Sequence, residues 1–138
     1  MTSTKQSVVL LAEDDEDLRE LIARRLVRAG MRVIEVEDGF ELRDYLELCR
    51  PGGDLAEPDA VVSDVNMPGD SGPLALEHFP FLRAPVVLIS AFSADVLAAW
   101  GHRVHAAAIF EKPLNLDDLI LALEVAIDRR EPAAVTVQ

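Results

Sequence analysis

The sequence predicts an α/β fold, a doubly wound parallel sheet with helices on both of its faces. The main observation is that five short apolar runs alternate with five helix-like stretches along the 138 residues. A second observation is that the first run, Val8-Val9-Leu10-Leu11-Ala12, is uniformly apolar, as a strand covered on both faces should be. Strands that alternate with helices in this way join through right-handed crossovers into a parallel sheet.

The apolar runs predict five strands, over residues 8–12, 31–36, 60–64, 85–90 and 107–110. The second run alternates in polarity, which suits a strand near the edge of the sheet. The first three helices are predicted from signals at their ends. Gly30 stops the first helix, Asp38 and Glu41 form a capping box before the second, and Pro73 suits the first position of a short third helix. The inner stripe of the first helix is Leu18, Leu21, Ile22, Leu26 and Ala29.

The last two helices also carry end signals. The fourth is predicted to run from a Ser93 cap to Trp100, with Gly101 ending it. The fifth is the clearest, because Asn115 caps it and apolar residues recur at helical spacing after that cap. Arg129-Arg130 favour its C-terminal end.

The bulk composition excludes several classes of protein. The net charge of −12 disfavours a nucleic-acid-binding module, which relies on Lys and Arg against phosphate. The apolar runs are far shorter than the roughly 20 residues of a membrane span, and the polar start lacks the features of a secretory signal. One cysteine excludes an internal disulfide and agrees with a cytoplasmic location. We expect one domain over residues 7–130, between a polar lead (1–6) and a tail (131–138).

Acidic residues follow two of the predicted strands, where the working site of such a sheet is found. Glu13-Asp14-Asp15 come after the first strand, and Asp64 closes the third. If both strands are central, at least three carboxylates converge, and a hard cation such as Mg²⁺ (or Mn²⁺) would relieve their repulsion. The alternative is that these acids only cap the next helix or its turn, a role that we do expect for Asp15, Glu16 and Asp17.

Lys112 distinguishes between these two interpretations. It ends the fifth strand, and the only other lysine is Lys5. A compact ammonium at this edge suits a phosphate or a carboxylate site. Ser90 ends the fourth strand with a hydroxyl that can donate to a phosphoryl oxygen, and Ala91 leaves space beside it. Together these residues predict carboxylate phosphorylation, with Asp64 as the nucleophile.

The chain resembles the bacterial response-regulator receiver domain, the family of the chemotaxis regulator, over roughly residues 7–130. The resemblance rests on four motifs that occur in order. They are Val9-Leu10-Leu11-Ala12-Glu13-Asp14-Asp15 with Leu18-Arg19, then Ser63-Asp64-Val65-Asn66-Met67-Pro68-Gly69 with Gly72, Ser90-Ala91, and Phe110-Glu111-Lys112-Pro113-Leu114.

This resemblance implies a flavodoxin-like sheet in the order 2-1-3-4-5. It implies that a sensor histidine kinase or a histidine phosphotransfer protein supplies the phosphoryl group, and that Glu13, Asp14, Asp64 and the backbone carbonyl of Asn66 bind Mg²⁺. It also implies a cis Lys112–Pro113 bond. An effector protein would dock on the fourth helix, fifth strand and fifth helix, and a homodimer is an alternative; neither DNA nor a membrane is expected as a direct partner.

Two positions affect how such a domain would signal. Ile109 stands where the family usually has Tyr or Phe as a rotating switch, and an aliphatic side chain cannot make that swing. Ile109 therefore affects how the domain would pass a signal to a partner, whereas acceptance of the phosphoryl group does not depend on it. Phe92, two residues after Ser90, flanks the phosphoryl group together with Asn66 in the family. We hypothesise that its bulk hinders attacking water and prolongs the phosphorylated state.

These residues are compatible with three functions to different degrees. The first is a phosphoaccepting switch that catalyses only its own phosphorylation and dephosphorylation, acting through a partner, as a relay or phosphate sink, or as part of a larger protein. The second is a pseudo-receiver that binds without phosphorylation, favoured by Ile109 but opposed by Asp64 and Lys112. The third is an enzyme, either an aspartyl phosphatase, which would need an acid at Asn66, or a dinucleotide-binding protein, which would need a Gly-rich turn after the first strand.

Overall fold

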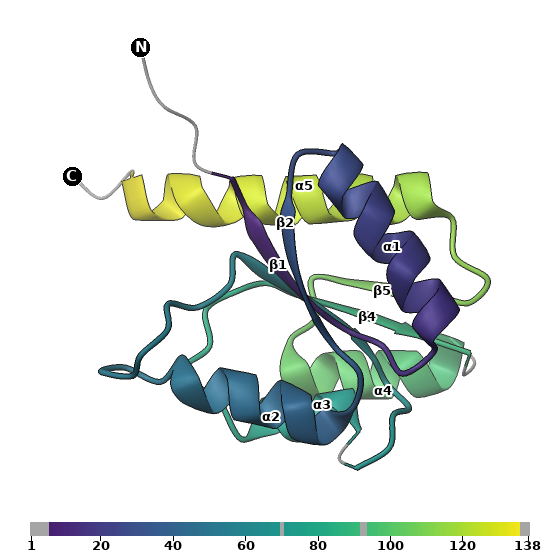
Figure 1. Cartoon of the computed structure of the whole chain (residues 1–138), viewed down its shortest axis with the longest axis horizontal. Helices are drawn as coiled ribbons and strands as arrows, with labels where there is room; N and C mark the ends of the chain where they lie inside the picture. The colour runs from purple at the N-terminus through teal and green to yellow at the C-terminus, as the bar shows by residue number, and fades with distance from the viewer. Residues whose placement is uncertain (1–5, 70, 92–93, 136–138) are drawn as a thin grey trace.

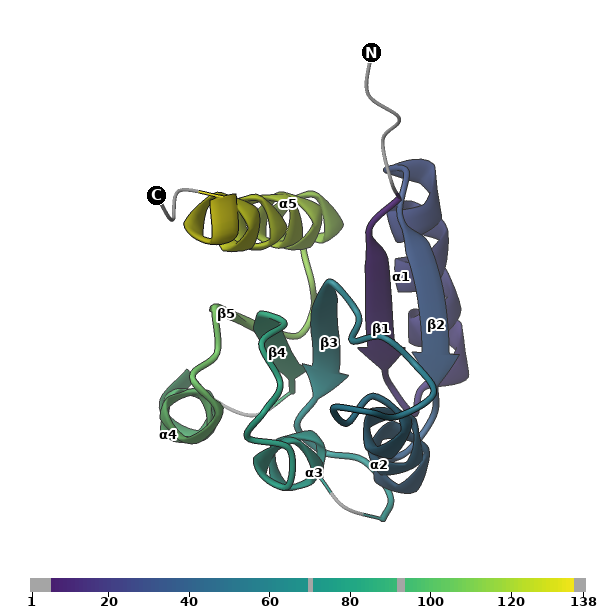
Figure 2. The ribbon, with the colours of Figure 1, turned by 90° about the vertical axis from the view of Figure 1, so that its left-hand side faces the viewer.

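A five-stranded parallel sheet forms the centre of the molecule in the computed structural model, which describes residues 6–69, 71–91 and 94–135. Figure 1 shows the whole chain, and the strand order β2-β1-β3-β4-β5, visible in Figure 2, confirms the predicted topology. Each strand lies close to its predicted position, and the bounds are β1 Val8–Ala12, β2 Arg32–Val36, β3 Ala60–Asp64, β4 Val86–Ser90 and β5 Ala108–Glu111. The alternating second strand is indeed at an edge, whereas β3 and β4 are buried along their whole length.

Helices cover both faces of the sheet (Figure 2). Helices α1 (Glu16–Arg28) and α5 (Leu116–Val135) lie on one face, while α2 (Gly39–Leu48), α3 (Gly72–Glu77) and α4 (Ala94–Val104) lie on the other. Each face has its own apolar core, because successive side chains of a strand point to opposite sides. Leu10 and Leu88 face α2, α3 and α4, whereas Leu11 and Ile89 face α1 and α5.

Several helix ends form as the sequence predicts. Asp15 caps α1 by accepting from the amide of Leu18 at 3.2 Å. Asp38 caps α2 and accepts from the amide of Glu41 at 2.8 Å. The amide of Asp118 donates to the Asn115 side chain at 3.0 Å before α5. Each bond satisfies an amide that the helix itself leaves without an acceptor.

The predicted end of α4 is wrong, because the helix continues through Gly101 to Val104. Glycine weakens a helix interior without breaking it, and at this position it lets α4 approach β5 closely. A Cβ at Gly101 would lie 2.5 Å from Ile109 Cδ1 on β5. The helix ends instead before His105, which has a positive φ of 55°. The Ser93 cap falls outside the described residues.

Two smaller differences from the sequence predictions concern α1 and α5. Leu21 was expected on the inner stripe of α1, yet its side chain is 48% exposed. Helix α5 continues to Val135, into the segment that we expected to be a tail. No helix among the described residues has both the length and the apolar character needed to cross a bilayer.

Gly72 sits where the start of α3 touches the end of β3. A Cβ at this position would overlap Ser63 Oγ and the backbone oxygen of Asp64. We predict that Gly72→Ala lowers the free energy of unfolding by about 1–3 kcal/mol, because the backbone oxygen of Asp64 in β3 cannot move away without disturbing the sheet. Gly101→Ala should change it by less than about 1 kcal/mol, since the end of Ile109 can move and alanine favours the helix. Urea unfolding of both variants measures the difference, and equal effects would refute this explanation.

Candidate functional site

Three carboxylates meet at the carboxyl edge of the sheet. Glu13 and Asp14 follow β1, and Asp64 ends the adjacent strand β3. One carboxylate oxygen from each residue lies within 4.8 Å of the others. Glu13 is fully buried and Asp64 is 3% exposed, whereas Asp14 faces solvent. The strand pairing predicted from the sequence therefore brings the three acids into one cluster.

Lys112 joins this cluster from the end of β5. Its Nζ donates to Asp64 Oδ2 at 2.8 Å and lies 3.0 Å from Glu13 Oε1. The backbone amide of Lys112 donates to the carbonyl of Ser90 at 2.8 Å, and the Lys112–Pro113 bond is cis. The ammonium is thus held against two buried carboxylates, with its side chain 21% exposed.

The oxygens of the cluster differ in how they are satisfied. Asp64 Oδ1 accepts from the backbone amide of Asn66 at 3.0 Å, and Glu13 Oε2 accepts from the amide of Asp15 at 3.1 Å. Glu13 Oε1 makes only the ion pair with Lys112 and accepts no hydrogen bond from the described residues, although it is buried. A buried carboxylate oxygen that faces only the Lys112 ammonium among the described residues, beside two more carboxylates, fits a hard divalent cation.

Electrostatics in the cluster are uneven. Burial raises the pKa of Glu13 to about 7 from its ordinary 4.5; the amide of Asp15 opposes this rise, the charge of Asp64 adds to it, and Lys112 opposes it. Burial alone would lower the pKa of Lys112, but the hydrogen bond to Asp64 and the charge of both carboxylates raise it overall. The lysine therefore stays protonated, while Glu13 can exchange a proton near neutral pH.

The remaining predicted site residues lie at the same edge or near it. Ser90 is buried at the end of β4, beside Glu111 of β5. Ala91 follows it and is exposed, as is Asn66 in the loop after β3. Ile109 lies on β5 with its side chain 37% exposed. Phe92 lies outside the described residues.

One residue with a contact to the cluster was noted in the sequence only for its spacing. Arg19 of α1 donates from Nη1 to the backbone oxygen of Glu13 at 2.8 Å, and its Nε lies 3.3 Å from Glu35 Oε1 on β2. Its position six residues after Glu13 is visible in the sequence. Its bond to Glu13 depends on how α1 packs beside β1 and β2.

Known proteins share both the sequence pattern and the fold. The family described as "Response regulator receiver domain" matches residues 9–124. The chain is 35% identical over 123 residues to the transcriptional regulatory protein PdtaR of Mycobacterium tuberculosis, covering 88% of this chain and 57% of PdtaR. It is 33% identical over 127 residues to the C4-dicarboxylate transport transcriptional regulatory protein DctD of Pseudomonas aeruginosa, covering 91% of this chain and 26% of DctD.

Solved structures agree with this assignment of the fold. The receiver domain of the Francisella response regulator 1452 superposes with a TM-score of 0.80 at 22% identity, over 91% of this chain and all of that one. The signal receiver domain of an HD domain-containing protein from Pseudomonas fluorescens gives 0.82 at 18% identity, over 99% and 98% of the two chains. The chain therefore belongs to the response regulator receiver domain family, whose members work in two-component systems.

Proposed function

We propose that this domain accepts a phosphoryl group on Asp64 from a sensor histidine kinase or a histidine phosphotransfer protein. The observation that carries the proposal is that Asp64 accepts a hydrogen bond from a lysine ammonium and has a carboxylate oxygen within 4.8 Å of oxygens from two further carboxylates. An aspartate that only ended a strand would need neither. The family match supports a two-component role. We also propose that the domain works in the cytoplasm, where its single cysteine would stay reduced.

The chemical step is a transfer between two atoms. An oxygen of Asp64 attacks the phosphorus of the donor and forms an O–P bond as the N–P bond of the phosphohistidine breaks. The electron pair stays on the imidazole nitrogen, which takes a proton from solvent. Lys112 and the Ser90 hydroxyl would bind the phosphoryl oxygens as their charge develops. The domain would catalyse only this reaction and the hydrolysis of its own acyl phosphate.

We further propose that Glu13, Asp14, Asp64 and the backbone carbonyl of Asn66 hold Mg²⁺, or Mn²⁺ in its place. The buried Glu13 Oε1, which meets only the Lys112 ammonium in the part of the chain that the structure describes, supports this assignment. The bound cation would supply positive charge against the transferring group. Asp14 faces solvent and so gives the ion a route from water. Phe92 and Asn66 would flank the phosphoryl group and set the rate of its hydrolysis.

Binding of the cation should depend on pH through Glu13. A metal ligand must lose its proton, and the pKa of Glu13 is raised to about 7. We predict that Mg²⁺ binds about tenfold more tightly at pH 8 than at pH 6. Calorimetric titration at the two pH values measures this ratio. Glu13→Gln should bind weakly with less pH dependence, and an unchanged dependence in that variant would exclude Glu13 as the cause.

The same shift has a consequence for the metal-free protein. Because the folded-state pKa of Glu13 lies above its ordinary 4.5, the protonated side chain favours the folded state. That contribution is fully present below about pH 4.5 and is lost as the pH rises through about 7.

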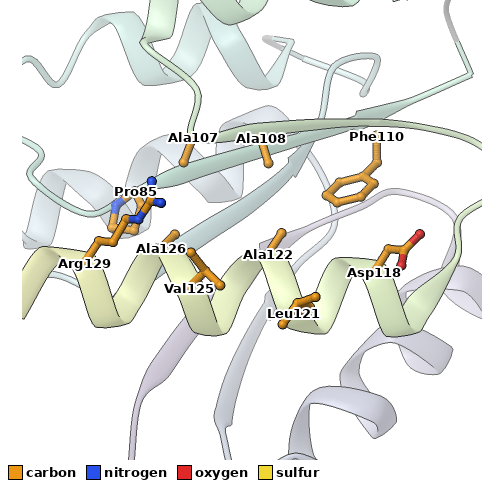
Figure 3. A pocket seen from close by; sticks show the side chains of 10 residues that line it. All are labelled: Pro85, Ala107, Ala108, Phe110, Asp118, Leu121, Ala122, Val125, Ala126 and Arg129. Carbon is orange, nitrogen blue, oxygen red and sulfur yellow. The ribbon is translucent and has the colours of Figure 1, made fainter.

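Output would pass through the face formed by α4, β5 and α5. A hollow of about 590 Å³ lies between β5 and α5. In Figure 3, Ala108 and Phe110 lie on its strand side, and Ala122 and Ala126 lie on its helix side. Leu121 is 59% exposed at its rim. These features support docking of an effector protein, with a second copy of the domain as the alternative. Ile109 packs against α4 at Gly101, so we propose that it relays the signal by a shift and not by an aromatic swing.

A pseudo-receiver that binds partners without phosphorylation is the second candidate, favoured by Ile109. Incubation with acetyl phosphate and Mg²⁺ separates the two functions, because acetyl phosphate can donate without a kinase. We expect the intact mass to rise by about 80 daltons, one phosphoryl group, and the gain to disappear when EDTA removes the metal. No gain in mass at any Mg²⁺ concentration would favour the pseudo-receiver.

A further inference from the structure

Arg19 makes two contacts that link the carboxylate cluster to the edge of the sheet. Its Nη1 donates to the backbone oxygen of Glu13 at 2.8 Å. Its Nε lies 3.3 Å from Glu35 Oε1 on β2, and the Arg19 side chain is only 14% exposed. The guanidinium therefore joins α1, the end of β1 and the edge strand β2. An arginine on a solvated helix face would be more exposed, and it would not donate to the backbone oxygen of a residue outside its own helix.

The contact with Glu13 fixes the backbone after β1, where Glu13 and Asp14 lie. The Glu13 amide donates to the carbonyl of Val36 on β2 at 3.1 Å, so β2 holds one side of this residue. Arg19 holds its carbonyl, which belongs to the peptide unit that joins Glu13 to Asp14. Rotation of that peptide would turn the Asp14 side chain away from Asp64. Glu35 keeps the guanidinium itself in place, because it binds a second nitrogen of the same planar group.

We propose that Arg19 is a positioning residue, which orients Glu13 and Asp14 so that both can bind a divalent cation. The inference rests on the proposed function, because it assigns a role within the same metal site. Arg19 does not bind the ion itself, because a guanidinium is a cation that only donates, and its nitrogens contact a carbonyl and the carboxylate of Glu35. Groups that orient metal ligands without touching the metal typically change its affinity by about 10–100-fold.

The direction in which metal affinity changes distinguishes a positioning role for Arg19 from a purely electrostatic one. A guanidinium near a cation site repels the cation, so loss of its charge alone should tighten metal binding. Loss of its hydrogen bond to Glu13 should weaken binding, because the two carboxylates would no longer be held together. A weaker site after removal of a positive charge is therefore the signature of positioning.

The experiment compares Arg19→Gln with Arg24→Gln. Arg24 lies on the same helix and pairs with Glu20 in solvent, so its variant removes the same charge from an exposed ion pair. Titration with Mn²⁺ alone, followed by the electron paramagnetic resonance signal of the free ion, gives the dissociation constant. We expect it to rise about tenfold or more in Arg19→Gln and less than about twofold in Arg24→Gln. Arg19→Lys should fall between wild type and Arg19→Gln, because an ammonium keeps the charge but not the planar fork.

The outcomes distinguish this inference from the proposed function. A wild-type protein that neither binds Mn²⁺ nor gains a phosphoryl group would overturn both. A wild-type protein that does both, together with an Arg19→Gln variant that binds Mn²⁺ as tightly or more tightly, would overturn the positioning role alone. If circular dichroism shows that Arg19→Gln is unfolded, Arg19→Lys replaces it, with Arg24→Lys as its control. Both variants keep the positive charge, so Arg19→Lys should weaken Mn²⁺ binding more than Arg24→Lys, and equal effects would reject the proposal.

Discussion

Asp64→Asn is expected to abolish phosphorylation, with no gain in mass after incubation with acetyl phosphate and Mg²⁺. The amide of asparagine is a poor nucleophile, so the O–P bond cannot form at this position. The variant should still fold. Asparagine has nearly the same shape, and its side-chain oxygen can keep the hydrogen bond from the Asn66 amide or from Lys112. The rate of phosphorylation should fall by at least about 100-fold, measured by intact-mass spectrometry over time.

Asp44→Asn is the matched control for this variant. Asp44 is an exposed aspartate on α2 and is not part of the carboxylate cluster. It loses the same charge and should be phosphorylated at the wild-type rate. If Asp64→Asn still gained one phosphoryl group at an undiminished rate, another residue would be the acceptor.

Lys112→Met should have the second largest effect, on both stability and phosphorylation. Lys112 is the cation that contacts Glu13 and Asp64, which are both buried. Removing one partner of a buried ion pair costs about 3–5 kcal/mol, because the remaining charge loses its compensation. We expect the free energy of unfolding in EDTA to fall by about 3 kcal/mol. The phosphorylation rate should fall about 100-fold, because one donor to the phosphoryl oxygens is lost.

Mg²⁺ should restore much of the lost stability in Lys112→Met, since the ion binds the same carboxylates in the folded protein alone. Urea unfolding with and without Mg²⁺ measures this recovery. Lys112→Arg serves as the comparison, because it keeps the charge but replaces the compact ammonium by a larger planar group. Equal stability of wild type and Lys112→Met in EDTA would show that the ion pairs of Lys112 contribute nothing to the fold.

The parts of the fold that depend on local chemistry were predictable from the sequence. The caps at Asp38 and Asn115 join atoms only three residues apart, so their signals lie within a few letters of the sequence. The end of α4 was not predictable in this way. Gly101 stays helical although glycine commonly ends a helix, and its close approach to Ile109 depends on how α4 packs against β5.

In the candidate site, too, some features were predictable from the sequence and others depend on tertiary packing. Parallel strands bring their carboxyl ends to one edge, and the pairing of β1 with β3 places Glu13 near Asp64. Lys112 comes to the same edge from β5, beyond β4, and its long side chain reaches both acids. The contact between Arg19 and Glu35 depends on the register of β1 with β2, in which Leu11 pairs with Glu35. Apolar periodicity gives the strands but not this register. The raised pKa of Glu13 likewise depends on its complete burial, which spacing does not reveal.

Chemical mapping of the phosphorylated residue tests the central claim most directly. Borohydride reduces an aspartyl phosphate to homoserine, which marks the modified position permanently. The wild-type protein would be treated with acetyl phosphate and Mg²⁺, reduced, digested and sequenced by mass spectrometry. We predict homoserine at position 64 and at no other aspartate. Homoserine at another position, or a phosphoryl group found only on a histidine, would contradict the assignment of Asp64 as the acceptor.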